Sequence, residues 1–495
     1  MTHARPGAGT RALAIVLATL SLASAARPAA AEPADVGRAR AWIEANVPRL
    51  MREARLPGFS IAIVQDGKTV YAEGFGARDP KKNLPATPDT LYGIGSLTKS
   101  FVAIAILQLA ERGQLGLDDP VAKHVPLELG LPGKPITIRH LLSHGQGFPN
   151  LGTSTVLISR GLGEDTGIPM SSADDFYRFV NGARDEVVFP PGERFFYNNA
   201  AWRMLGHIVQ RASGVPFHRY VKQEILDPLG MKRSTLDTAV AFADPDHLVP
   251  HRVGKTGPEP TAFPYPNPED NLDFSFLSAA GGILSSVNEM TAYLNALIAQ
   301  GRHPGGRLAS AEAMAQMQTL QIDQEAGHFG RVGYGYGLGV TPGFLGHKLV
   351  SHGGSVAVST AHMAFVPDLS LGIVMMGNGP GMAYGAIAET VFALMMGRDP
   401  DEALPGNAIR KRMDRLVGNY AIYRGLETLK VRKRGGLLYI GGEEPGTPLI
   451  PEDPTYQSSR LYTLGEGLKS PVEFRVREDG SVILLVDRYV YHKGQ

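Results

Sequence analysis

A serine and a lysine stand three residues apart in the stretch GIGSLTKSF, residues 93–101, at the head of a strongly apolar segment. Side chains at positions i and i+3 of a helix share one face, so Ser96 and Lys99 are predicted to touch. A lysine at the rim of a buried helix loses hydration, which lowers its pKa and makes its neutral amine available to a serine proton. The pair therefore indicates a nucleophilic serine. The alternative is a helix-capping serine beside a solvated lysine.

Two further stretches carry residue types suited to the same chemistry. FPPGERFFYNNAAW places Tyr197 and Asn199 before a predicted helix, and VSHGGSVAVS places His352, Gly354 and Ser355 on a predicted strand. In order and spacing, the three stretches resemble the S-x-x-K, Y-x-N and K-T-G or H-x-G motifs of the serine β-lactamase and penicillin-binding-protein superfamily. The branch they resemble is the class C β-lactamase-like group of esterases, D-amino-acid peptidases and carboxypeptidases. The resemblance covers about residues 40–396.

The resemblance implies a role for each of these residues. Ser96 would be the acylating nucleophile, and Lys99 would assist its deprotonation. Tyr197 would be the partner base, with its phenolate favoured by the nearby ammonium. Asn199 would bind the substrate or Lys99. The backbone N–H groups of Ser96 and Ser355, the latter following Gly354, would form an oxyanion hole.

The third motif departs from the Lys-Thr-Gly of β-lactamases, because His352 and Gly353 stand in its place. Histidine is less reliably charged near neutral pH, and glycine offers no hydroxyl to a substrate carboxylate. We therefore expect ester or peptide-like substrates, D-amino-acid derivatives included. The alternatives are an acylatable sensor of β-lactams or peptidoglycan fragments, and a true β-lactamase or D-alanyl-D-alanine carboxypeptidase.

Apolar periodicity and turn signals predict the elements that would hold these residues. The predicted helices cover about residues 35–55, 96–112, 198–214 and 384–396, and the predicted strands are a hairpin around Asp66-Gly67 and runs at 349–366 and 371–378. Two stretches, 150–175 and 238–272, are predicted as long loops at the rim of a cleft. The expected fold class is α/β (α+β), a β-lactamase/transpeptidase-like antiparallel sheet flanked by helices with an all-helical lobe.

The character of the chain changes after residue 397. Residues 398–407 have the composition of a linker, which would separate a hydrolase domain over 32–397 from a second domain over 408–495. The second domain shows short strands with alternating apolar residues. Such a pattern predicts a small antiparallel barrel, and the segment also resembles the lipocalin-like β domain appended to some superfamily members.

Composition excludes several other functions. The 495 residues carry a net charge of +1, which gives no basic surface for nucleic acid. The chain has no cysteine, so disulfides, thiol nucleophiles and thiolate metal sites are excluded. His140 and His144 have a spacing that can bind zinc on a helix, but no H-E-x-x-H pattern accompanies them. We expect no metal and no cofactor, and a small-molecule or short-peptide substrate.

The N-terminus has the pattern of a secretory signal peptide. Arg5 and Arg11 precede the apolar run ALAIVLATLSLASA, and Ala29, Ala30 and Ala31 offer a cleavage site after residue 31. The run is too short to span a bilayer, which needs about 20 apolar residues. We therefore expect an exported protein, periplasmic or secreted, with no membrane span after cleavage. The oligomeric state is left open.

Overall fold

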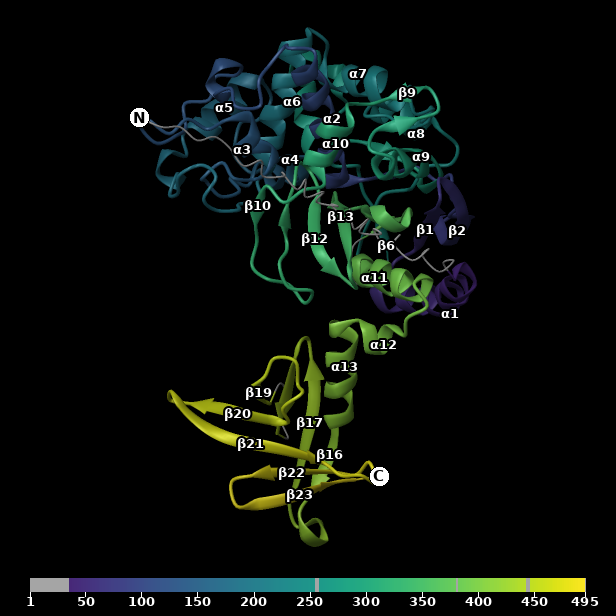
Figure 1. Ribbon diagram of the computed structural model, residues 1–495, viewed down its shortest axis with the longest axis vertical. Helices are drawn as coiled ribbons and strands as arrows, with labels where there is room; N and C mark the ends of the chain where they lie inside the picture. Colours follow the sequence, from purple (N-terminus) through teal and green to yellow (C-terminus); the bar gives the residue numbers. More distant parts are fainter. Residues whose placement is uncertain (1–34, 254–257, 380–381, 442–445, 495) are drawn as a thin grey trace, which may run out of the picture. The chain divides into compact units, whose positions relative to one another are not determined.

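The computed structural model describes residues 35–253, 258–379, 382–441 and 446–494 (Figure 1). The predicted signal peptide, residues 1–31, lies outside these ranges. Among the described residues, none of the helices is both long enough and apolar enough to cross a membrane.

A nine-stranded antiparallel sheet forms the centre of the N-terminal domain, in the order β10-β11-β12-β13-β14-β15-β1-β2-β3. Its strands are β1 (Gly58–Gln65), β2 (Lys68–Asp79), β3 (Leu84–Pro85), β10 (Ile322–Asp323), β11 (Gly333–Tyr334), β12 (Gly339–Phe344), β13 (His347–Ser355), β14 (Thr360–Val366) and β15 (Leu371–Gly377). Because β1 pairs with β15, segments from both ends of the domain meet in the middle of the sheet. The helices between them are inserted, as the sequence predicted.

The β1–β2 hairpin shows how the local sequence sets this geometry. Asp66 and Gly67 both have positive φ, 50° and 76°, which two-residue hairpin turns favour. Successive residues of β1 then face opposite layers. Ile61 packs in one hydrophobic cluster and Ala62 in the other, as the two-residue period of a strand requires.

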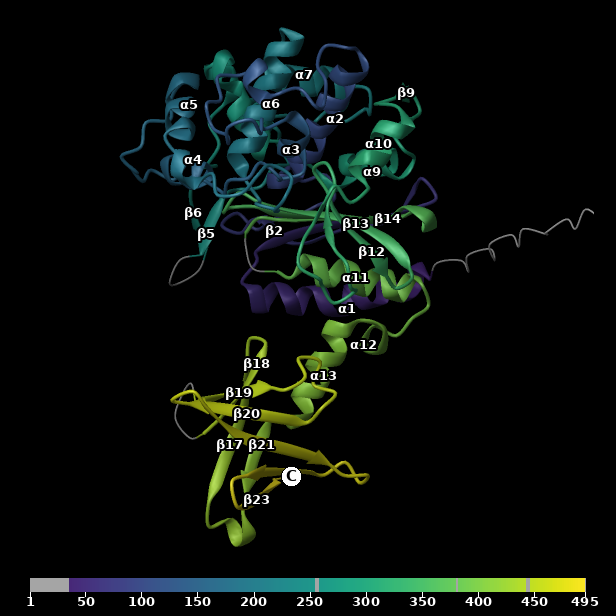
Figure 2. The ribbon, with the colours of Figure 1, turned by 60° about the vertical axis from the view of Figure 1, so that its left-hand side comes forward.

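Helices cover both faces of the sheet (Figure 2). One layer consists of α1 (Val36–Ala54) and α11 (Tyr384–Met395), which pack with Ile61 and Ile373. The other layer is a helical lobe around α2 (Thr98–Glu111) and α6 (Asn199–Ser213). All residues of α2 from Thr98 to Leu109 are buried, which confirms the prediction of an internal helix.

The rest of the lobe consists of shorter elements. They are α3 (Ile138–Leu142), α4 (Thr153–Gly161), α5 (Ala173–Asn181), α7 (Phe217–Val221), α8 (Thr238–Ala243), α9 (Val287–Ile298), α10 (Ala311–Met317), the 3₁₀ helix η6 (Leu272–Ala280), and the strand pairs β4 (Tyr92–Gly93) with β7 (Leu284–Ser285), β5 (His251–Val253) with β6 (Pro258–Pro260), and β8 (Arg302–His303) with β9 (Gly306–Arg307). The stretches predicted as loops at 150–175 and 238–272 contain the short helices α4, with 9 residues, and α8, with 6 residues. Helices of this length have too few turns to show a clear apolar period.

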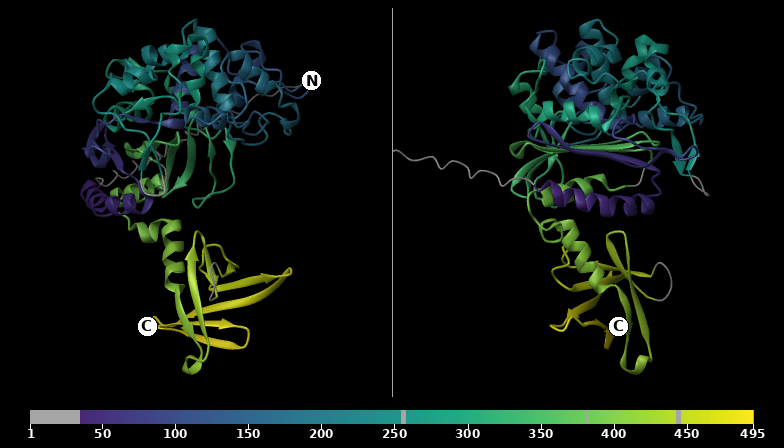
Figure 3. Two further views of the ribbon diagram at one scale, coloured as in Figure 1. Left: turned by 180° about the vertical axis from the view of Figure 1, so that it is seen from behind. Right: turned by 90° about the vertical axis from the view of Figure 1, so that its right-hand side faces the viewer.

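The C-terminal segment forms a closed antiparallel barrel of eight strands, β16 to β23 in sequence order (Figure 3). They are β16 (Gly418–Ala421), β17 (Thr428–Arg434), β18 (Leu437–Ile440), β19 (Thr447–Pro451), β20 (Arg460–Gly465), β21 (Leu468–Val476), β22 (Val482–Val486) and β23 (Tyr489–Lys493). The predicted linker, 398–407, contains α12 (Pro400–Ala403) and the first turn of α13 (Pro405–Leu416).

Side chains fill the interior of this barrel. Ten of its side chains are each at most 3% exposed: Tyr420, Val431, Leu438, Leu449, Leu461, Val472, Phe474, Val482, Leu484 and Tyr491. Phe474 and Leu484 face each other across β21 and β22, on the inward face that their alternation predicted. The predicted antiparallel barrel is confirmed, while its lipocalin-like character stays a prediction.

Candidate active site

Ser96 lies in a tight turn between β4 and α2. The turn is the 3₁₀ segment Gly95–Leu97, which runs directly into the first residue of α2. Gly95 has φ 54°, and a Cβ at this position would lie 2.4 Å from the backbone nitrogen of Ser355. Only glycine allows this approach, so the turn presents Ser96 beside the end of β13.

The amino group of Lys99 lies in contact with three oxygens. Nζ is 2.9 Å from Ser96 Oγ, 2.8 Å from Asn199 Oδ1 and 2.9 Å from the carbonyl oxygen of Ala280. The side chain is fully buried. The i, i+3 spacing predicted the contact between Lys99 and Ser96. Asn199 was expected to bind either the substrate or Lys99, and the structure shows its contact with Lys99.

These contacts fit a neutral amine. Burial lowers the pKa of Lys99 well below its ordinary value, and the positive charge of Arg203 lowers it further. A neutral amine has two N–H bonds and one lone pair. The oxygens of Asn199 and Ala280 can only accept, so they take the two N–H bonds. The lone pair is left facing Ser96, whose hydroxyl can donate to it.

Tyr197 lies against the same pair, and its expected ionisation is wrong. Its ring centroid is 4.9 Å from Lys99 Nζ, and its hydroxyl forms a hydrogen bond with Ser96. Burial raises the pKa of Tyr197 above its ordinary value, and this effect exceeds that of the hydrogen bond. The Tyr197 phenolate was expected because a charged Lys99 would favour it. With a neutral lysine, that charge is missing and Tyr197 stays a phenol.

The end of β13 lies next to the Ser96 turn. A Cβ at Gly354 would lie 2.0 Å from the carbonyl oxygen of Ile94 and 2.9 Å from the Ser96 nitrogen. A Cβ at Gly95 would in turn lie 2.4 Å from the Ser355 nitrogen. The structure thus brings together the two backbone nitrogens that were predicted to form an oxyanion hole.

His352 is buried, and both of its ring nitrogens have partners. Nδ1 lies 2.6 Å from the carbonyl oxygen of Gly353, to which it can only donate, so Nε2 accepts from the Tyr334 hydroxyl at 2.8 Å. Burial lowers the pKa of His352 to about 3, with a further contribution from Lys99. The histidine is therefore neutral near pH 7 and supplies no cation. Its predicted contact with substrate stays a prediction.

Sequence reasoning missed several residues around this centre. His144 packs against Tyr197, with ring centroids 4.3 Å apart and the ring planes tilted by 33°, and its two ring nitrogens lie 3.0 Å from the backbone nitrogen of Asn198 and from Nε1 of Trp202. The stretch RHLLSHG was considered as a possible zinc site, with a structural role as the default, and His144 was not assigned to the serine site. Among the described residues, no group of three or more potential ligands could hold a metal ion. Ala280 also went unnoticed, because a backbone carbonyl carries no signal in side-chain type.

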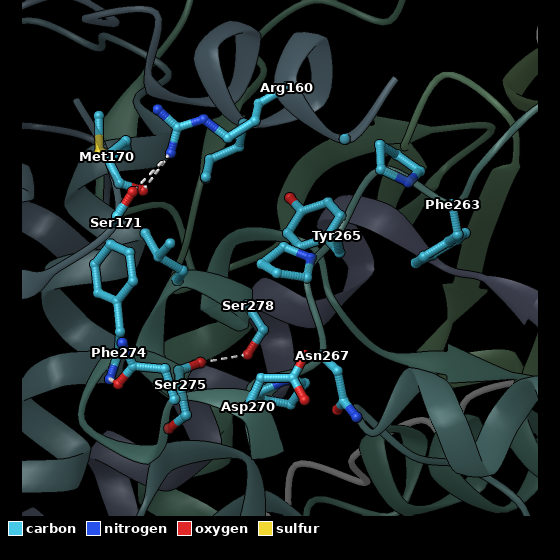
Figure 4. Close-up of a pocket in the computed structure, with 17 residues that line it drawn as sticks. Arg160, Met170, Ser171, Phe263, Tyr265, Asn267, Asp270, Phe274, Ser275 and Ser278 are labelled. Carbon is cyan, nitrogen blue, oxygen red and sulfur yellow. Dashed lines mark hydrogen bonds between the residues drawn. The ribbon is translucent and has the colours of Figure 1, made fainter. Parts of the chain in front are cut away.

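A cavity of about 320 Å³ is lined by Tyr265 and by residues of η6 (Figure 4). Phe263 and Tyr265 form one wall, and Phe274 and Ser278 of η6 belong to another. The remaining lining residues are Leu157, Arg160, Gly161, Met170, Ser171, Pro264, Pro266, Asn267, Pro268, Asp270, Asn271, Ser275 and Leu277. Tyr265 connects the cavity to the nucleophile, because a Cβ at Gly281 would lie 2.7 Å from its hydroxyl and 3.4 Å from the carbonyl carbon of Gly95.

The sheet with its helical lobe, together with a serine held by a buried lysine, defines a serine hydrolase of the β-lactamase type. Residues 43–393 match the family model described as Beta-lactamase, and residues 400–492 match the model described as the Pab87 octamerisation domain. The first match covers well over half of the sequence. The chain belongs to the β-lactamase family, which confirms the resemblance of its motifs.

Comparisons with individual proteins agree. The octameric penicillin-binding protein homologue from Pyrococcus abyssi is 36% identical, with a TM-score of 0.81 over 93% of this chain and 100% of that one. The β-lactamase/D-alanine carboxypeptidase from Yersinia pestis, complexed with citrate, has a TM-score of 0.56 and 20% identity over 72% of this chain and 98% of that one. The second likeness concerns the fold alone.

Curated relatives match over shorter segments. Protein flp of Staphylococcus aureus (strain MW2) is 34% identical over 196 residues, which are 39% of this chain and 37% of flp. Esterase EstB of Burkholderia gladioli is 33% identical over 233 residues, which are 46% of this chain and 57% of EstB. The chain therefore matches less than two thirds of the length of either relative.

Proposed function

We propose that the protein hydrolyses esters or peptide-like amides, D-amino-acid derivatives included, through an acyl-enzyme on Ser96. The observation that carries the proposal is the set of three contacts of Lys99. They direct the amine lone pair at the Ser96 hydroxyl, within hydrogen-bond distance of the proton to be removed.

The reaction follows from these positions. Lys99 accepts the Ser96 proton as Oγ attacks the substrate carbonyl carbon, while the N–H groups of Ser96 and Ser355 stabilise the oxyanion. One such donor contributes about 3 kcal/mol in other enzymes. The Lys99 ammonium then returns the proton to the departing alcohol or amine, and Tyr197 relays it as a neutral phenol. Water releases the acyl group by the same steps in reverse.

The third motif favours esters and amides over penicillins. A neutral His352 offers no positive charge where β-lactamases place a lysine against the substrate carboxylate. The cavity lined by Phe263, Tyr265 and Phe274 is mostly apolar and would accept the apolar part of an acyl group. The relative named an esterase, EstB, supports the ester alternative.

The substitution Ser96→Ala tests the proposal. It should abolish hydrolysis of a short-chain ester and of a D-amino-acid p-nitroanilide, because it removes the hydroxyl that lies 2.9 Å from Lys99 Nζ. Mass spectrometry after exposure to a fluorophosphonate should show one adduct on the wild type and none on the variant. Turnover by the purified variant would contradict the proposal. Labelling of the wild type without turnover would favour an acylatable sensor, for which penicillin is the second probe.

We also propose that the chain assembles through its C-terminal barrel. This segment matches the model described as the Pab87 octamerisation domain. The Pyrococcus abyssi homologue, which is covered over its full length, is described as octameric. The barrel also exposes large apolar side chains, with Leu426 82% and Leu468 75% exposed. Both side chains are accessible for contact with another copy of the chain.

Export is a further part of the proposal, and it rests on the N-terminal pattern of charged, apolar and small residues. N-terminal sequencing of protein from the periplasm or the medium should start at Glu32. A start at Met1 would contradict cleavage.

A further inference from the structure

The most unusual charged group near the site is Arg203, on α6. Its side chain is fully buried. Nε donates to the carbonyl oxygen of Leu277 at 3.2 Å, Nη1 to Thr153 Oγ1 at 2.7 Å, and Nη2 to Ser154 Oγ at 3.1 Å. The guanidinium also forms a hydrogen bond with the Tyr265 hydroxyl.

All of these partners are neutral. Within the part of the chain that the structure describes, no carboxylate pairs with Arg203. Burial lowers the pKa of Arg203, yet a guanidinium keeps its proton in proteins. A buried charge without a counter-ion is costly to stability, and such groups concentrate at functional sites.

The charge is close to Lys99. Asn199, which accepts a hydrogen bond from Lys99, lies one helical turn before Arg203 on the same face of α6. The other titratable groups that face Lys99 are Tyr197, His144 and His352, from the segments before α6, after α3 and on β13. None of these groups is a carboxylate that could hold the lysine in its ammonium form.

We propose that Arg203 is a positioning residue of the reaction, whose uncompensated positive charge keeps Lys99 in the amine form that accepts the Ser96 proton. This inference rests on the proposed function of Ser96 and Lys99. Two cations cannot share a buried site cheaply, and Arg203 cannot release its proton, so Lys99 does. Once Lys99 has taken the serine proton, repulsion from Arg203 favours its return to the leaving group.

The test supplies Arg203 with the counter-ion it lacks. Ser154 is half-buried and touches Nη2, so Ser154→Asp would place a carboxylate beside the guanidinium. The neighbouring Thr155 is exposed, and among the described residues no hydrogen bond joins it to Arg203, so Thr155→Asp adds the same charge away from the hydrogen-bonded groups of the guanidinium. Ser154→Asn controls for side-chain size.

The readout is the pH dependence of kcat/KM for a neutral short-chain ester, followed by pH-stat titration. In Ser154→Asp the acidic limb should move to higher pH, because a weakened positive field leaves Lys99 protonated to higher pH. The ratio of kcat/KM at about pH 6.5 to that at about pH 9 should fall at least about threefold. The limb should not move in Thr155→Asp or Ser154→Asn. A limb in Ser154→Asp that superimposes on the wild type would overturn the proposal.

Substitution of Arg203 itself gives a second, independent measurement. Arg203→Met removes the charge and should shift the limb in the same direction, whereas Arg203→Lys keeps a cation and should shift it less. A uniform loss of activity at every pH in Arg203→Met would mean a structural role only and would overturn the proposal. The proposed function fails separately, if Ser96→Ala retains turnover. If Ser96→Ala is inactive but the acidic limb of Ser154→Asp does not move, the role proposed for Arg203 is rejected and the proposed function stands.

Discussion

At the scale of single residues, the chemistry depends on which of Lys99 and Tyr197 can accept a proton. Both lie against Ser96, but burial acts on them in opposite senses. It lowers the pKa of the lysine and raises that of the tyrosine, because in each case the charged form is disfavoured. In the proposed mechanism these directions give Lys99 the role of base near neutral pH and Tyr197 the role of a donating hydroxyl.

Replacement of Lys99 tests this assignment. Lys99→Met should lower kcat/KM by about 10²–10⁴-fold, the usual contribution of a general base. Lys99→Arg places a permanent positive charge at this position and cannot deprotonate, so it should be as inactive as Lys99→Met. Appreciable activity in Lys99→Arg would show that the lysine acts as a cation only. Steady-state kinetics with one neutral ester measure both variants.

The wild-type pH profile follows from the same pKa directions. The fraction of Lys99 amine grows as pH rises through its lowered pKa, so kcat/KM should rise and reach a plateau well below pH 10. Tyr197→Phe should reduce the plateau by about 10²-fold and leave the acidic limb in place. The phenylalanine ring would still pack against His144, so the fold should be retained. Disappearance of the limb in Tyr197→Phe would show instead that the phenolate is the base.

At the scale of elements, the site depends on the close contact between β13 and the Ser96 turn. Gly354→Ala tests this contact, because its Cβ would lie 2.0 Å from the Ile94 carbonyl oxygen. A shift of the turn should lower kcat about 10²-fold, and the overpacking should cost about 1–3 kcal/mol of unfolding free energy.

Gly353→Ala is the matched control on the same strand. Its Cβ would meet only His362 Nδ1 at 3.7 Å, an ordinary van der Waals contact. Urea unfolding and ester kinetics should therefore separate Gly354→Ala from Gly353→Ala. Equal behaviour of the two variants would mean that the approach of β13 does not constrain the nucleophile.

Local patterns predicted the elements that depend on neighbours in sequence. The Asp66-Gly67 turn, the apolar run of α2 and the ordered motifs around Ser96, Tyr197 and His352 were all visible in the sequence. Features that arise from long-range packing were not visible in the sequence. Ala280 contributes a carbonyl oxygen and Arg203 an unpaired charge, and neither property is apparent until α6 and η6 pack together. The predicted phenolate form of Tyr197 was wrong for the same reason, because the burial that raises its pKa depends on the assembled fold.

At the scale of the whole molecule, the hydrolase fold is built from distant parts of the chain. β1 pairs with β15 across more than three hundred residues, and the helical lobe that carries α2 and α6 is inserted between them. The nucleophile follows the first strands, whereas Ser355 comes from the last ones. The proposed oxyanion hole would therefore form only when the sheet is complete, which would tie activity to the folding of the entire N-terminal domain.

The barrel makes a different contribution, because its buried core is separate from those of the hydrolase domain. We predict that the full-length protein is larger than a monomer in solution and that apolar side chains of the barrel hold the assembly together. The double substitution Leu426→Asp and Leu468→Asp should yield smaller species, since two buried carboxylates per subunit would be uncompensated in the interface.

Size-exclusion chromatography with light scattering measures this mass directly. Val188→Asp is the control, because Val188 is 59% exposed but lies in the hydrolase domain. Circular dichroism should show that the double variant keeps its strands, since both side chains are on the surface and outside the barrel core. A monomeric wild type would reject assembly altogether, and an unchanged mass in the double variant would reject these barrel residues as its interface.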